Sequence, residues 1–244
     1  MLRSNAVDLY GWSILFKGTF WPGPLIGRKL EDTIAETAET GHEVGLYAWD
    51  HHQWQTHVDE ADGHGVRRMI DEGMQEFMRI TRKAPACSAA PGWKCTDTVL
   101  REKARYSFTY NSDCRGAYIF RPAVDGRGLE QPQVPLTLPT YDEVIGRDGI
   151  TNDNYNDRIL GMILPGQLNV LTIYTEVEGI AYAHMFDDFL RAAKERGVSF
   201  VPWKYCARKA KSGRLRPSSR DRFPGAEVCW PSKSKPRGES NAQR

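Results

Sequence analysis

The order of hydrophobic and polar positions predicts helices and strands that alternate along most of the chain. In residues 66–81 the apolar side chains of Met69, Ile70, Met74 and Phe77 recur at the spacing of one helix face, which predicts an amphipathic helix. A similar spacing predicts further helices over residues 29–40, 98–104, 154–163 and 185–196. Short apolar runs predict strands over residues 43–49, 86–90, 107–110, 170–176 and 198–202. Such alternation is typical of α/β proteins with a mostly parallel sheet, either open or closed into a barrel.

Two stretches depart from this alternation. Residues 121–139 are rich in proline, glycine and glutamine, so we interpret them as an inserted excursion. From residue 204 onward the chain is dominated by Lys, Arg, Ser, Pro and Gly without a hydrophobic period. We therefore predict a folded domain over residues 1–203 and a basic, disordered tail over residues 204–244. The tail is expected to be solvated and without a partner, and contact with an anionic lipid surface is the alternative.

The bulk composition is that of a globular protein and argues against several classes. Hydrophobic residues make up 40% and charged residues 26% of the 244 residues, and a net charge of +2 gives no reason to expect nucleic acid as a partner. The five cysteines form no Cys-x-x-Cys pair, which argues against a disulfide framework and against a zinc–thiolate site. Neither a membrane span of roughly 18 apolar residues nor a signal peptide is recognisable, so we expect a cytoplasmic protein.

Side chains able to do chemistry follow the predicted strands, at the ends where parallel sheets place their active sites. These residues are Trp49, Asp50, His51, His52, Pro91, Gly92, Trp93, Asn111, Ser112, Asp113, Cys114, Arg115, Tyr174, Glu176 and Glu178. Imidazole and carboxylate groups bind Zn²⁺, Mn²⁺ or Co²⁺, and tryptophan stacks on sugars, so the set is typical of a metal-assisted hydrolase acting on a sugar. Plainer interpretations exist: a loop histidine is commonly solvated, a tryptophan beside a glycine commonly packs, and Asp113 can cap a turn.

Residues 41–52, GHEVGLYAWDHH, carry the most specific motif. They resemble the second motif of the polysaccharide deacetylase (NodB-like) family, in which a Gly-His-Glu-(Ile/Val)-Gly lead-in precedes His-x-x-x-His. Further strings resemble one branch of that family, the 4-deoxy-4-formamido-L-arabinose-phosphoundecaprenol deformylases. They are AWDHHQW, CSAAPGW, YNSDCRG, FRP, LPTYDEVIGRD and EVEG, with MLRSNAVDLYGW at the start. The resemblance extends from Met1 to about Pro202.

The resemblance implies a distorted (β/α) barrel with a divalent zinc, manganese or cobalt ion held by one Asp and two His. The metal is expected to polarise an amide carbonyl and activate a water, with an acidic residue as base and a histidine as acid. In this branch the substrate is a formamido sugar on a polyprenyl phosphate at the cytoplasmic face of the bacterial inner membrane. The freed amino sugar is destined for lipid A, where its charge gives resistance to polymyxin and cationic peptides. The implied partner is this lipid-linked sugar, with peripheral membrane contact and no nucleic acid.

The chain departs from the family pattern at three places. Nothing before Gly41 resembles the Asp-x-Asp motif of the first strand, so the barrel is expected to be incomplete at its amino terminus. His51 falls on the second metal-binding histidine, whereas Tyr47 occupies the position of the first. A phenol must ionise from a pKa of about 10 to bind a metal well, which costs roughly 4 kcal/mol at neutral pH. Tyr174 stands where the family has its acid histidine, and a phenol reprotonates a leaving amine less readily.

Two hypotheses of different classes follow. In the first, the protein is a metal-dependent hydrolase that releases formate from the lipid-linked sugar, with Asp113 orienting the site and Trp49, Trp54, Trp93 and Arg115 binding the substrate. In the second, it is a catalytically silent, truncated relative that at most binds the sugar-lipid. We favour the first for the function of the family and the second for turnover by these 244 residues. A deacetylase of chitin-like or peptidoglycan sugars is a weaker third hypothesis, because the branch-specific strings match another substrate.

Overall fold

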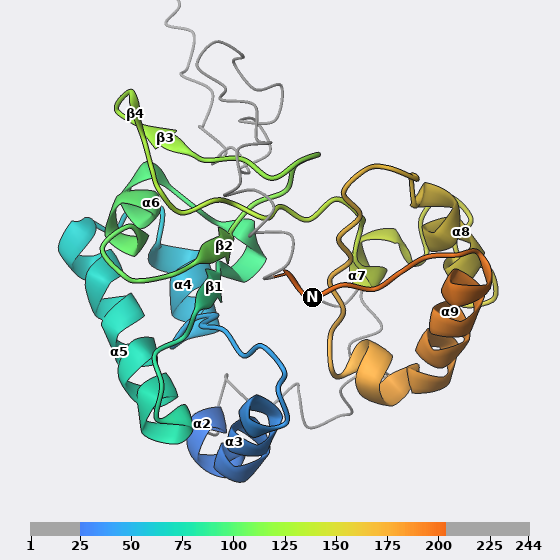
Figure 1. Cartoon of the computed structure of the whole chain (residues 1–244), viewed down its shortest axis with the longest axis horizontal. Coiled ribbons are helices and arrows are strands. Elements are labelled where there is room, and N and C mark those ends of the chain that lie inside the picture. Colours follow the sequence, from blue (N-terminus) through green and yellow to red (C-terminus); the bar gives the residue numbers. More distant parts are fainter. Residues whose placement is uncertain (1–24, 204–244) are drawn as a thin grey trace, which may run out of the picture.

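The computed structural model describes residues 25–203 of the chain (Figure 1). The tail predicted over residues 204–244 lies outside the described residues. Residues 1–24, which precede the place where the barrel is expected to be incomplete, lie outside them as well. The described elements form two groups. One group contains α2 to α6 with β1 to β4, and the other contains α7, α8 and α9 (Figure 1).

The helices of the first group are α2 (Ile26–Lys29), α3 (Glu31–Glu39), α4 (His51–His57), α5 (Gly63–Thr81) and α6 (Asp97–Lys103). Asp62 starts α5 by accepting a hydrogen bond from the backbone N–H of Gly65 at 2.8 Å, and the helix ends at Arg82 in a left-handed conformation. The buried face of α5 shares one hydrophobic core with α4, α6 and the sheet, made of Leu46, Trp54, Val58, Val66, Met69, Ile70, Ala90, Val99 and Phe108.

A short parallel sheet lies next to this core. Its strands are β1 (Cys87–Ala89) and β2 (Tyr110–Ser112), with Cys87 opposite Tyr110. Single residues extend the parallel pairing on both sides, because Leu46 pairs with Ser88 and Asn111 pairs with Gln133. Beyond them, Leu138 donates its backbone N–H to the oxygen of Val170 at 3.0 Å. Among the described residues these segments form a row that does not close into a barrel.

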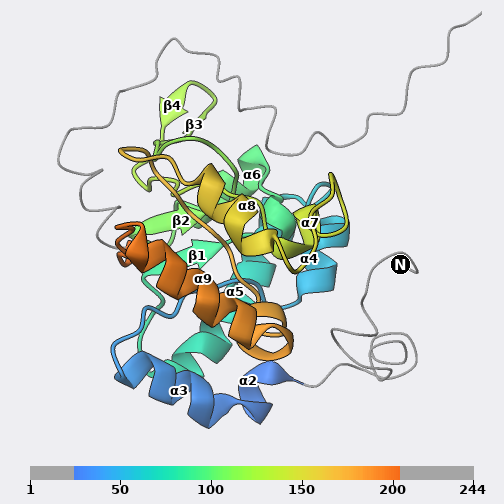
Figure 2. The same ribbon diagram turned by 90° about the vertical axis from the view of Figure 1, so that its right-hand side faces the viewer.

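The second group surrounds a separate hydrophobic core. Its elements are α7 (Tyr141–Val144), α8 (Tyr155–Met162), a π-helical turn (Val177–Ala181) and α9 (Ala183–Glu195). In the turned view of Figure 2, α8 and α9 lie side by side, and the two helices are in contact. The buried side chains of this core are Leu138, Tyr141, Ile150, Tyr155, Ile159, Leu160, Val177, Phe189 and Ala193.

The α/β class and the five predicted helices are confirmed, but several predicted strands are wrong. Residues 43–49 contribute only the bridge at Leu46, and residues 170–176 and 198–202 form no strand. The excursion predicted over residues 121–139 holds a small hairpin, β3 (Ala123–Val124) with β4 (Arg127–Gly128), and then rejoins the sheet at Gln133. Helix α4 was not predicted, because its seven residues, nearly two turns, show no clear apolar period.

None of the helices within residues 25–203 is both long and apolar enough to cross a membrane.

Candidate active site

The segment from Gly45 to His51 leads from the sheet into α4 and carries two of the predicted site residues. Asp50 caps α4 by accepting a hydrogen bond from the backbone N–H of Gln53 at 2.7 Å, so His51 stands in the first turn. The ring of Tyr47 meets the ring of His51 edge to face, with 5.4 Å between their centroids. The position predicted for a pair of metal-binding histidines therefore holds a phenol and an imidazole in contact.

Both of these side chains are neutral at neutral pH. Burial lowers the pKa of His51 below its ordinary value of 6.5, against the opposing effects of the Asp50 charge and a hydrogen bond with Gln55. Burial also raises the pKa of Tyr47, although a hydrogen bond with the Gly92 backbone acts in the opposite direction. His51 can therefore accept a proton, and Tyr47 can donate a hydrogen bond.

The turn Pro91–Trp93 lies beside Tyr47 and has an unusual backbone. Gly92 and Trp93 have φ angles of +60° and +54°, in the left-handed region. The positive φ of Gly92 favours glycine, and a Cβ atom there would also lie 2.7 Å from Nε2 of Gln55, whose side chain would have to move. The left-handed backbone of Trp93 is energetically unfavourable for a residue with a side chain, and such strain is common at functional sites. The turn brings the ring of Trp93 under the guanidinium of Arg115, at 4.2 Å from the ring centroid.

Arg115 follows β2 and joins the two groups of elements. Its Nη2 donates to Oε2 of Glu143 in α7 at 2.5 Å, and its Nη1 donates to the backbone oxygen of Leu138 at 3.2 Å. The same Glu143 oxygen accepts the backbone N–H of Thr140 at 2.9 Å, which caps α7. Held between Trp93 and Glu143, Arg115 keeps about a fifth of its side chain exposed.

Tyr174 lies close to Thr140, the residue that caps α7. The hydroxyl groups of Tyr174 and Thr140 share a hydrogen bond. Burial, followed by the charges of Asp142 and Tyr47, raises the pKa of Tyr174 to about 12. That Tyr47 influences this pKa places the two phenols near each other, although 126 positions separate them in the sequence.

Two predicted site residues lie in the core and not in the site. Asp113 is fully buried, where it accepts hydrogen bonds from Nζ of Lys103 at 2.5 Å and from Nε2 of Gln133 at 3.0 Å. Trp54 is 2% exposed and donates its Nε1–H to the oxygen of Lys94 at 3.1 Å. Its ring cannot stack on a sugar from this position, so we leave Trp54 out of the site.

The remaining residues meet through a continuous series of contacts. It runs from His51 through Tyr47 and the turn at Trp93 to Arg115, and through Glu143 and Thr140 to Tyr174. We call the residues His51, Tyr47, Trp93, Arg115 and Tyr174 the five-residue site. Trp49, which is 42% exposed, follows Tyr47 by two positions. Glu143 and Thr140 were not predicted, although the Thr-x-x-Glu spacing of a capping box at residues 140–143 was a readable signal.

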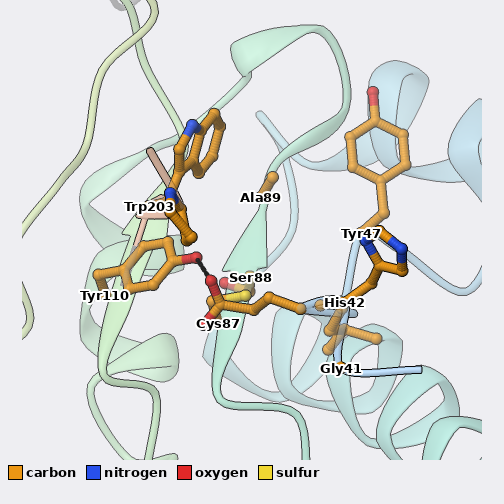
Figure 3. Close-up of a pocket in the computed structure, with 12 residues that line it drawn as sticks. Gly41, His42, Tyr47, Cys87, Ser88, Ala89, Tyr110 and Trp203 are labelled. Atoms are coloured by element: carbon orange, nitrogen blue, oxygen red, sulfur yellow. Dashed lines mark hydrogen bonds between the residues drawn. The ribbon is translucent and has the colours of Figure 1, made fainter. Parts of the chain in front are cut away.

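Tyr47 also borders a hollow of about 520 Å³. Figure 3 shows Tyr47 and His42 along one wall and Tyr110 and Trp203 along the other. The Tyr110 hydroxyl donates to Oε2 of Glu43 at 2.7 Å, and the rings of Tyr110 and Trp203 meet edge to face. Tyr47 is the member of the five-residue site that borders this hollow.

The metal expected from the family resemblance does not fit the described residues. No group of three or more His, Cys, Asp or Glu within residues 25–203 has the arrangement of a metal site. His51 has Tyr47 as its neighbour where a second histidine is expected, and the neutral phenol is a poor ligand. We therefore derive no chemical step through a metal.

Comparisons with known proteins identify the relatives of this chain. No protein-family model matches it. It is 50% identical over 202 residues to a protein of Shewanella sediminis named 4-deoxy-4-formamido-L-arabinose-phosphoundecaprenol deformylase ArnD, a match that covers 83% of this chain and 65% of the relative. The chain thus spans slightly less than two thirds of that protein. A protein of the same name from Wigglesworthia glossinidia brevipalpis is 38% identical over 207 residues, covering 84% of this chain and 71% of the relative.

A solved structure supports the fold. The crystal structure of a protein of Mycobacterium smegmatis named as a polysaccharide deacetylase superposes with a TM-score of 0.63 at 18% identity. It covers 90% of this chain and 81% of that one. The open row of parallel segments is therefore the described part of a polysaccharide deacetylase fold. The chain belongs to the family of the 4-deoxy-4-formamido-L-arabinose-phosphoundecaprenol deformylases.

Proposed function

We propose that this protein is an amide hydrolase that removes formate from 4-deoxy-4-formamido-L-arabinose carried on undecaprenyl phosphate. The observation that carries the proposal is the meeting of five side chains from four separate segments at one site, in a chain 50% identical to a relative named for this reaction. The formamide C–N bond breaks, a water supplies the oxygen of formate, and the sugar nitrogen gains a proton that comes from this water and leaves as a free amine. In the cell, this step would supply the amino sugar that modifies lipid A and lowers sensitivity to polymyxin.

Each residue of the five-residue site has a role that its state allows. The neutral imidazole of His51 accepts a proton from the attacking water. The phenols of Tyr47 and Tyr174 remain protonated and donate hydrogen bonds, to the formyl oxygen and to the leaving nitrogen. Trp93 and the half-exposed Trp49 offer faces on which a sugar ring stacks. Arg115, held between Trp93 and Glu143, turns its remaining donors toward the polar groups of the substrate.

The family resemblance adds a divalent zinc, manganese or cobalt ion, which would polarise the formyl group when bound. Among the described residues only His51 matches an expected ligand, so this part of the proposal depends on donors that the described chain does not supply. The polyprenyl portion of the substrate lies in a bilayer, and we propose that the protein meets it as a peripheral protein at the cytoplasmic face of the inner membrane.

A second candidate function is binding of the sugar-lipid without turnover. It is favoured by Tyr47 and Tyr174, because phenols replace a metal-binding and an acid histidine of the family. The pKa of about 12 at Tyr174 makes its phenol a weak acid toward a leaving amine. The surfaces that bind the sugar, Trp93 and Arg115, are unaffected by these replacements.

Formate release and binding can be measured on the same preparation. The full chain is mixed with the formamido-arabinose lipid in detergent micelles, formate is quantified enzymatically, and binding is followed by tryptophan fluorescence. Release that His51→Ala lowers by about a hundredfold supports the hydrolase. The matched variant His57→Ala, at the other end of α4, should leave release unchanged. Binding without release selects the second candidate, and the absence of both would refute both functions.

A further inference from the structure

The backbone around Tyr174 lacks the support that a sheet strand would have. Within the described chain, the sheet row ends at Val170, whose oxygen accepts the N–H groups of Thr137 and Leu138. Residues 171–176 form no strand. Tyr174 nevertheless presents its phenol to Thr140 in the five-residue site. Something other than a ladder of backbone hydrogen bonds must therefore hold its backbone in place.

Glu178 supplies that support from both sides of the peptide unit. Oε2 of Glu178 accepts the backbone N–H of Tyr174 at 2.8 Å. The backbone N–H of Glu178 in turn donates to the oxygen of Tyr174 at 2.9 Å, and the N–H of Val177 donates to the same oxygen at 3.0 Å. Together these bonds satisfy both the backbone N–H and the backbone oxygen of Tyr174, which neighbouring strands would satisfy in a sheet. Glu178 is the second residue of the π-helical turn Val177–Ala181, and its side chain reaches back to the N–H of Tyr174.

Burying the carboxyl group of Glu178 in its surroundings costs free energy of folding. The residue is 3% exposed, and its Oε1 has no hydrogen-bond partner among the described residues. Burial raises the pKa of Glu178, and the negative charges of Asp142 and Glu176 act in the same direction, whereas hydrogen bonds from backbone N–H groups act in the opposite direction. The buried hydroxyl of Tyr155 is also without a partner, and the charge of Glu178 raises its pKa. A methionine would fill the same space without this cost, which argues that the carboxyl group is there for its bond to Tyr174.

We propose that Glu178 is a positioning residue, which holds the backbone of Tyr174 and thereby sets where the Tyr174 phenol stands in the five-residue site. That this placement serves formate release rests on the proposed function. Glu178 itself does not touch the substrate. Its action passes through the 174 backbone to the phenol, while Thr140 fixes the other end of the same side chain.

Amide hydrogen exchange tests the placement without any assay of activity. The full chain is labelled with ¹⁵N-tyrosine, and the Tyr174 signal is assigned by its loss in Tyr174→Phe. In Glu178→Met the Tyr174 amide should exchange at least about tenfold faster, whereas Glu178→Gln, which keeps an oxygen acceptor, should stay within about threefold of the parent. The Tyr182 amide, which donates to Val177 at 2.7 Å in the same turn, serves as internal control. Equal protection of Tyr174 in the parent and in Glu178→Met would overturn the proposal.

A second measurement decides the question if Glu178→Met does not fold. In the parent protein the Tyr174 amide proton should shift as the carboxyl group of Glu178 titrates, with a midpoint above 4.5, the ordinary pKa of a glutamate. The titration should be absent in Glu178→Gln and present in Glu176→Gln, which removes a carboxylate from the same segment. A Tyr174 amide proton that titrates identically in the parent and in Glu178→Gln would refute the bond.

Activity separates this inference from the proposed function. If the parent releases formate, Glu178→Met should lower kcat about tenfold or more with KM within about twofold, and Glu178→Gln should restore most of kcat. A parent that releases no formate would refute the hydrolase, while the exchange data would still decide whether Glu178 positions Tyr174. A drop in kcat of equal size in Glu178→Gln and Glu178→Met would contradict positioning through the retained acceptor.

Discussion

The guanidinium of Arg115 lies 4.2 Å above the ring centroid of Trp93 and bonds to Glu143 on its other side. This sandwich links the strand end of the first group of elements to α7 of the second. Its parts come from the turn after β1, the segment after β2 and the first turn of α7. The link therefore depends on tertiary structure, because its three parts lie far apart in the sequence.

Arg115→Lys should weaken this link although it keeps the charge. A lysine cannot stack its head on Trp93 and bond to both Glu143 and Leu138 as a planar fork does, so we expect a loss of about 1–2 kcal/mol in the free energy of unfolding. Urea denaturation measures it. The matched change Arg101→Lys alters an exposed pair with Asp125 and should cost less than about 0.5 kcal/mol. Equal losses at both positions would mean that the stacking on Trp93 contributes nothing.

Tyr47→His should create affinity for a divalent ion. It places a second imidazole next to His51, where the parent has a neutral phenol whose pKa is raised by burial. We expect the Kd for Zn²⁺ to fall by about tenfold or more, as measured by calorimetry at neutral pH. Tyr47→Phe, which keeps the ring and removes the hydroxyl, should show no gain. If the histidine variant binds Zn²⁺ no better than the phenylalanine variant, residues 47 and 51 do not form a metal-binding pair in this protein.

Lys103 and Asp113 form an ion pair that is almost completely buried, at 2% and 0% side-chain exposure. Lys103→Met leaves the Asp113 carboxylate without its cation and should destabilise the protein by about 3–5 kcal/mol. The double variant Lys103→Met/Asp113→Leu removes both charges and should recover most of that loss. Chemical denaturation of the single and double variants provides the comparison. A double variant as unstable as the single one would show that the network through Gln133 matters more than the paired charges.

Gly73→Ala should disturb the segment that carries Tyr47 and His51. The added Cβ would lie 2.8 Å from Cδ1 of Leu46, so the Leu46 side chain or the segment around it must move, at a cost of about 1–3 kcal/mol. Gly161→Ala in α8 is the matched control, because nothing lies within 4 Å of its Cβ. That change should stabilise the protein by about 0.5–1 kcal/mol through helix propensity. Thermal unfolding of both variants checks the opposite signs, and a neutral Gly73→Ala would exclude the close packing.

The pH dependence of stability should reveal the buried carboxyl group of Glu178. Burial raises its pKa above 4.5 in the folded state, so the folded protein holds this proton more tightly than the unfolded chain does. The resulting stabilisation is complete below pH 4.5 and is lost as the pH rises through the raised value. The parent should therefore lose stability relative to Glu178→Gln as the pH rises above about 4.5. A parent that gains stability relative to this variant over the same range would show that the charged carboxylate is the favoured form.

The sequence by itself determined five of the helices and the family. The apolar spacing of residues 66–81 predicts an amphipathic helix without reference to any distant residue. Asp62 and Arg82 set the ends of α5 by local hydrogen bonds. The string GHEVGLYAWDHH was specific because it combines a lead-in and a ligand position within twelve residues. The replacements at Tyr47 and Tyr174 were visible in the same way. These features depend on neighbours within a few positions, so no folded structure was needed to recognise them.

Burial and pairing were decided only by the tertiary structure. Trp49 and Trp54 look equivalent in sequence, but Trp54 lies in a core built from α5, α6 and the sheet, whereas Trp49 remains 42% exposed. Apolar runs such as residues 170–176 predicted strands, yet a strand needs a partner of matching register, and Tyr174 bonds to the Glu178 side chain instead. Contacts between residues distant in sequence decide such outcomes. For this reason the motif names the family, while the position of each side chain in the site follows from the fold.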